Sequence, residues 1–90
     1  MTGTKMHIEV TEEDIKAGVP CDLRLCPIAR AAMRAGARNP IVTVRAIVEI
    51  GSRGRTWSMP REAIRWRQQF DAKEKVEAFV FDARLGKPKE

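Results

Sequence analysis

Residues 26–36 read C-P-I-A-R-A-A-M-R-A-G, and this stretch predicts the helix around which the rest of the chain is arranged. Pro27 marks its start, because proline at a first helical position presets φ and loses no hydrogen bond. Gly36 marks its end, since glycine readily adopts the left-handed conformation that closes a helix. Arg30 and Arg34 are expected to carry charge outward. The apolar positions at helical spacing, which are expected to face a core, are Ile28, Ala29, Ala32 and Met33.

Four strands are expected around this helix. Residues 5–10 alternate between apolar and polar side chains, which is typical of a half-buried strand. Residues 41–50 are apolar at every second position and predict one long strand in the middle of the sheet. The glycine-bounded loop 51–54 then turns the chain back into a strand at 55–59. Residues 76–83 are apolar on both faces and predict the closing strand.

Two further helices are expected. Thr11 followed by three acidic residues is typical of a capped helix start, and Gly18 ends that short helix. Pro60 begins the other helix, which is expected to run to Asp71 with Ser58 as its cap. The side chains expected in its buried stripe are Ala63, Trp66 and Phe70.

The resulting order, β-α-α-β-β-α-β, predicts an α+β fold with a mainly antiparallel sheet and helices packed on one of its faces. Ninety residues suffice for one small domain, which is expected to span 1–90 with flexible ends at 1–4 and 86–90. No apolar run approaches the roughly 20 residues of a membrane span, so no membrane contact is predicted. The amino end lacks the apolar segment of a secretory signal, which predicts a cytoplasmic protein with reduced thiols.

The net charge of +5 is concentrated in the middle of the chain. Residues 1–23 carry −3, residues 24–67 carry +8, and residues 68–90 carry no net charge. All ten basic residues of the middle segment are arginine, whose planar guanidinium suits phosphate and carboxylate groups. Such a surface either binds an anionic partner or is a solvated basic exterior.

The candidate binding residues are arginines expected on the hairpin, the third helix and the central helix. They are Arg53, Arg55, Arg61, Arg65, Arg30 and Arg34. Trp57 beside the hairpin could stack on a base, which would favour nucleic acid, but a core position for Trp57 is expected equally. No helix-turn-helix, zinc-finger or RRM signature is present, so protein and nucleic acid both stay open as partners. The oligomeric state is open as well.

Cys26 is the candidate for thiol chemistry, because the amides and dipole of a helix start can lower a thiol pKa. The chain has a single histidine, and free cysteine is usually buried, which favours a structural thiol. Cys21, Cys26 and His7 lack C-x-x-C spacing and lie on separate elements, so no metal site is predicted. No catalytic residue, cofactor or enzymatic activity is predicted either.

Four motifs of the sequence are similar to one protein family. They are E-E-D-I-K-A-G (12–18), C-D-L-R-L-C-P-I-A-R-A (21–31), M-P-R-E-A-I-R-W (59–66) followed by F-D, and V-E-A-F-V-F (76–81). Over about residues 8–81 the chain resembles small uncharacterised proteins encoded by bacteriophages and prophages. The matching positions are Cys26, Pro27, Ile28, Ala29, Ala31, Pro60, Glu62, Ala63, Phe70, Asp71, Phe79 and Phe81. Arg30 departs from the pattern, because an apolar residue, often Leu, is usual there.

The resemblance implies a kind of function and supplies no catalytic residues. It implies only a phage-type genomic setting, in which compact single-domain proteins often act by binding a host protein or a nucleoprotein defence complex. The expected location is the cytoplasm of the host cell. The hypothesis is therefore a non-enzymatic phage or mobile-element protein that inhibits a host or defence complex, in the manner of an anti-CRISPR protein, through its arginines. The alternative is a small nucleic-acid-binding protein.

Overall fold

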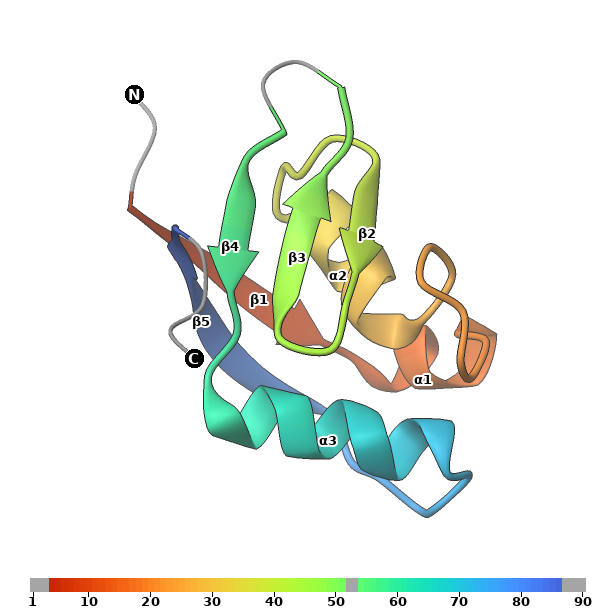
Figure 1. Cartoon of the computed structure of the whole chain (residues 1–90). Coiled ribbons are helices and arrows are strands. Elements are labelled where there is room, and N and C mark those ends of the chain that lie inside the picture. The colour runs from red at the N-terminus through yellow and green to blue at the C-terminus, as the bar shows by residue number, and fades with distance from the viewer. Residues whose placement is uncertain (1–3, 52–53, 87–90) are drawn as a thin grey trace.

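One curled antiparallel sheet organises the computed structural model, which describes residues 4–51 and 54–86. Its strands are β1 (Lys5–Val10), β2 (Pro40–Val42), β3 (Ala46–Glu49), β4 (Thr56–Ser58) and β5 (Phe79–Leu85). They lie in the order β1-β5-β4-β3-β2, so the first and last strands are neighbours (Figure 1). β1 and β2 form the two edges. The predicted α+β class and antiparallel sheet are confirmed.

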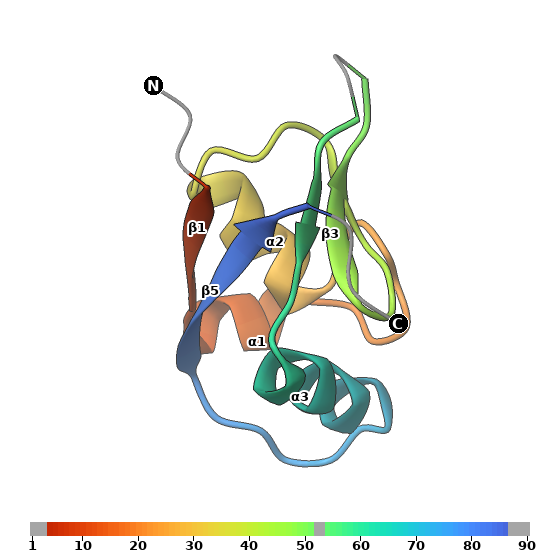
Figure 2. The same cartoon turned by 60° about the vertical axis from the view of Figure 1, so that its left-hand side comes forward.

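Three helices lie within the described residues: α1 (Glu12–Ala17), α2 (Pro27–Arg34) and α3 (Arg61–Asp71). α2 begins at Pro27 as predicted, and Gly36 beyond its end has a φ of +109°. Figure 2 shows α2 inside the curl of the sheet, between β1 and β3. Buried side chains of α2 and α3 belong to one core cluster, which confirms that the helices pack on one face. None of these helices is long and apolar enough to cross a membrane.

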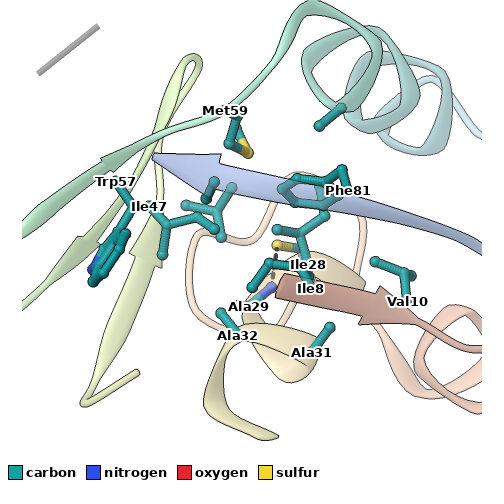
Figure 3. Close-up of a cluster of buried hydrophobic side chains, with 14 of the residues drawn as sticks. Ile8, Val10, Ile28, Ala29, Ala31, Ala32, Ile47, Trp57, Met59 and Phe81 are labelled. Carbon is teal, nitrogen blue, oxygen red and sulfur yellow. Dashed lines mark hydrogen bonds between the residues drawn. The ribbon is translucent and has the colours of Figure 1, made fainter. Parts of the chain in front are cut away.

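The core forms between α2 and the concave face of the sheet. Alternation along β1 turns Ile8 inward, opposite Phe81 of β5. Both side chains lie beside Ile28, which is 0% exposed (Figure 3). The buried arc of α2 is centred on Ile28 and includes Ala31, so Met33, expected in the core, lies beyond the arc and is 58% exposed.

The prediction of a single strand over 41–50 is wrong, because the chain reverses between β2 and β3. The Thr43 N–H donates to the carbonyl of Ala46 at 2.8 Å, and the Thr43 hydroxyl accepts from the Ala46 N–H at 3.2 Å. This threonine closes a tight turn without glycine or proline. The reversal changes which residues face inward: Ile47 is buried, whereas Val44 and Ile50 are exposed.

The closing strand also differs from the predicted 76–83, because β5 begins at Phe79 and continues to Leu85. β1 ends at Val10, the partner of Phe79, so the preceding residues have no strand beside them. They bond to side chains instead: the Trp66 indole donates to the Glu77 carbonyl at 2.8 Å.

Two smaller expectations concern caps and ends. Ser58 does not cap α3, because it lies in β4 and its hydroxyl donates to the Arg84 carbonyl. Of the ends expected to be flexible, residues 1–3 and 87–90 lie outside the described residues. Thr4 accepts a hydrogen bond from the Leu85 N–H, and Gly86 donates one to Thr56.

We predict that Trp66→Ala will destabilise the protein by about 3 to 5 kcal/mol, because Trp66 fills the contact between α3 and β5. Its ring stacks on Phe79 with centroids 4.8 Å apart and on Phe70 at 5.7 Å. Urea denaturation followed by circular dichroism measures the loss. Gln68→Ala, at an exposed position of the same helix, is the control. Equal stability of the two variants would contradict this packing.

Candidate functional site

Two of the predicted binding arginines, Arg30 and Arg34, surround the buried carboxylate of Asp14. Asp14 is 0% exposed. Arg34 binds it with both ends of the guanidinium, donating to Oδ1 at 3.0 Å and to Oδ2 at 2.6 Å. Arg30 Nε lies 3.5 Å from Oδ1. We call Asp14, Thr11, Arg30 and Arg34 the Asp14 cluster.

The Asp14 cluster also closes the start of α1. Thr11 and Asp14 form a reciprocal capping box, in which the Thr11 N–H donates to Asp14 Oδ2 at 2.9 Å. Arg34 additionally donates to the carbonyl of Glu9 at 2.7 Å. Burial by itself raises the pKa of Asp14, but the hydrogen bonds from Arg34 and Thr11 outweigh burial and lower the pKa to about 2. Arg34 therefore stabilises the fold through this bidentate contact, whereas Arg30 lies beside the carboxylate at ion-pair distance without a hydrogen bond from its Nε.

A second buried carboxylate, Glu49, engages the predicted binding residue Arg55. Glu49 is 4% exposed and accepts from the Trp57 indole at 2.7 Å and from the Arg38 N–H at 3.0 Å. Arg55 Nε lies 3.3 Å from Glu49 Oε2. Burial raises the pKa of Glu49, but these donors and the charge of Arg55 lower it below its usual value. Trp57, a possible base-stacking residue by sequence, is thus a buried donor.

Arg67 is the fourth arginine used inside the fold. It donates to the carbonyl of Thr43 at 3.2 Å and lies 3.7 Å from the carboxylate of Asp71. Asp71 also accepts from the N–H of Cys21 at 2.9 Å. Arg67 therefore ties α3 to the turn between β2 and β3.

Exposed arginines gather where that turn meets the start of α3. The Met59 N–H donates to the carbonyl of Arg45 at 2.8 Å, so the turn lies against the residues that lead into α3. Arg61 and Arg65 follow one helical turn apart and are exposed, as Arg45 is. Within 4–51 and 54–86 these three side chains form no ion pair with a carboxylate. We call Arg45, Arg61 and Arg65 the turn–helix arginines.

The structure divides the predicted arginine set. Arg53 lies outside the described residues. Arg55 lies just before the start of β4, and Arg61 lies after its end, at the start of α3. Because β4 runs from the upper loop down to α3 in Figure 1, the two arginines lie beyond opposite ends of this strand. Arg61 and Arg65 remain together on α3, and Arg45 joins them. Sequence reasoning missed Arg45 because the turn that exposes it was predicted as strand.

Cys26 lies in the core, where it caps α2. It is 1% exposed, and its Sγ accepts from the Ala29 N–H at 3.4 Å. Burial raises the pKa of the Cys26 thiol. His7, on the outer face of the sheet, lies 2.8 Å from the carboxylate of Asp82. The geometry thus separates the thiol from the histidine and fits a structural role for Cys26.

We predict that the protein loses stability below pH 4 because the Asp14 carboxylate becomes protonated. The folded-state pKa of about 2 lies below the ordinary value of 3.8, so the stabilisation is complete above pH 4 and is lost as the pH falls toward 2. The loss amounts to roughly 2 kcal/mol. Asp14→Asn cannot ionise, so the gap in unfolding free energy between wild type and this variant should shrink over that range. Glu13→Gln, at an exposed position, is the control. A difference in unfolding free energy that does not change with pH for Asp14→Asn, or that changes equally for Glu13→Gln, would contradict this role of Asp14.

We also predict that the Cys26 thiol reacts slowly in the native protein. The exposed Cys21 should be labelled first by a thiol reagent, and Cys26 only when the core opens. Mass spectrometry of a labelling time course in wild type and Cys21→Ser separates the two sites. Native labelling of Cys26 faster than free cysteine would show an activated thiol.

The guanidinium groups of the turn–helix arginines are able to bind carboxylate or phosphate groups. Depressions of about 410 Å³ and 90 Å³ beside the Asp14 cluster are both lined by Arg34, whose guanidinium is already engaged. In the described part of the chain, no three His, Cys, Asp or Glu side chains lie close enough together to hold a metal ion.

The chain was compared with protein-family models, with curated proteins and with solved structures, and none of the three comparisons found a match.

Proposed function

We propose that this chain is a non-enzymatic binding protein of phage or mobile-element type that inhibits a host or defence complex, in the manner of an anti-CRISPR protein. The observation that carries this proposal is the exposed group of turn–helix arginines. Arginine binds carboxylate and phosphate through a planar donor fork, so the group suits an anionic protein or nucleoprotein surface. The phage-type setting rests on the sequence resemblance alone.

The division of the arginines supports a compact contact. Four arginines lie within ion-pair distance of carboxylates of the fold, which neutralise part of their charge: Arg30, Arg34, Arg55 and Arg67. Within the described residues the turn–helix arginines pair with no carboxylate, so their charge is not neutralised in this way. They also sit on α3 and on a turn anchored to it by Arg67, so the backbone that presents them is held in place. Fixed positive charge of this kind favours fast association and the choice of an acidic partner.

Nucleic acid is the second candidate, and the aromatic side chains weigh against it. Binding of single strands depends on aromatic faces that stack on bases. Trp57 is buried, and Trp66, Phe79 and Phe81 stack on one another at the core. A nucleic-acid partner would therefore have to be held through its phosphates alone, with a strong dependence on salt.

Reversing the turn–helix arginines tests the proposal. Arg45→Glu, Arg61→Glu and Arg65→Glu combined should weaken partner binding at least about tenfold, while stability changes by about 0.5 kcal/mol or less per site. Lys16→Glu, Lys73→Glu and Lys75→Glu combined give the same change in net charge at exposed positions elsewhere. The assay is plaque formation by a phage in cells whose CRISPR system targets it, together with recovery of the tagged protein's partner from those cells.

Cells that express wild type or the lysine variant should show plaques, and both proteins should be recovered with the partner. Cells that express the arginine variant should show no plaques, and this variant should be recovered without the partner. Retention by all three proteins at physiological salt would refute the assignment of this surface. Nuclease treatment separates the two candidates, because a nucleic-acid binder loses its partner, whereas an inhibitor that contacts the protein part of its target complex retains that protein.

A further inference from the structure

β1 is an edge strand whose outward main-chain groups are open. Leu85 N–H donates to the Thr4 carbonyl, and the register pairs each residue of β1 with one of β5. Because main-chain direction alternates along a strand, the N–H and C=O of Lys5, His7 and Glu9 point away from β5. Among the described residues, only the Glu9 carbonyl has a partner on that side, the guanidinium of Arg34.

The other edge of the sheet is closed. The Val42 N–H of β2 donates to the Leu23 carbonyl at 2.8 Å, so the connector before α2 covers that edge. Beside β1, by contrast, a depression of about 90 Å³ lies between the strand and α2. Ala31 and Ala35 line its α2 side together with Arg34, which reaches the Glu9 carbonyl. An edge strand with open main-chain groups is a site at which another strand can add.

The side chains on this edge are complementary to themselves. Lys5, His7 and Glu9 are exposed and share the outer face of β1. An antiparallel copy of the same strand, centred on His7, brings each Lys5 opposite Glu9 of the other copy and His7 opposite His7. Opposite charges directly across an antiparallel pair stabilise it, and like charges destabilise it.

We propose that β1 is a homodimer interface at which two copies pair edge to edge about His7. The contact is isologous, as two-fold symmetry requires, and it joins the two sheets into one. The facing pairs exchange main-chain hydrogen bonds through the groups that point away from β5. The Glu9 carbonyl takes part with its second lone pair, since Arg34 uses one. Figure 2 shows α2 toward the interior of the curl. Ala31, Arg34 and Ala35 are the α2 residues that line the depression beside β1.

Sedimentation of the full chain at concentrations from roughly 1 μM to 1 mM detects a dimer whose dissociation constant lies in that range. Lys5→Glu puts two carboxylates opposite each other at both ends of the contact, and Glu9→Lys does the same with two ammonium groups. Each variant alone should raise the dissociation constant at least about tenfold. An equimolar mixture of the two variants should form a heterodimer, because both facing pairs of residues 5 and 9 are then of opposite sign.

His7→Pro provides an independent test, since proline removes an N–H that the monomer does not use and is tolerated at sheet edges. It should abolish the dimer, whereas His7→Ala retains the N–H and should keep it. A wild type that stays monomeric throughout the range overturns the proposal. Failure of the mixed variants to associate, or a folded His7→Pro variant that still dimerises, overturns it as well.

Discussion

A single buried carboxylate, Asp14, holds the first three elements of the chain together. Its oxygens accept from the N–H of Thr11 and from the guanidinium of Arg34, and that guanidinium also reaches the carbonyl of Glu9. The end of β1, the first turn of α1 and the last turn of α2 therefore share one network. A carboxylate without such donors would not be buried at this position, because the desolvation would not be offset.

Glu49 has the corresponding role in the second half of the fold. It joins the segment after α2, through the Arg38 N–H, to the indole of Trp57 on β4 and to Arg55. Buried ion pairs are often no more stabilising than apolar packing of the same volume. We therefore interpret both carboxylates as fixing geometry, because each accepts donors from several elements at once and leaves few other arrangements in which those donors are satisfied.

The sequence predicted the elements whose signals are local: the start and end of α2, the alternation of β1 and the buried stripe of α3. The prediction of one strand over 41–50 failed at Thr43, whose side chain closes a turn. Such a turn is predictable from sequence when it contains glycine, proline or asparagine, and this one contains none of them. The sequence did not predict the pairing of Arg34 with Asp14, since an outward position on a helix is compatible with solvent or with a carboxylate on a neighbouring helix. Asp14 lies 20 residues before Arg34 in the sequence. The capping-box pattern of Thr11 and Asp14 predicts a helix start, but it does not predict which side chain packs over Asp14.

The arrangement of charge links the two surfaces for which we propose roles. The strand order places β1 at one edge of the sheet, and the turn that carries Arg45 belongs to the β2–β3 hairpin at the other. Two copies joined at β1 would therefore present their turn–helix arginines at opposite ends of the combined sheet. Such a pair would bind a repeated or symmetric anionic target through two sites, because the second contact would form at high effective concentration. Weak contacts made by a few arginines on each copy would then suffice for tight binding.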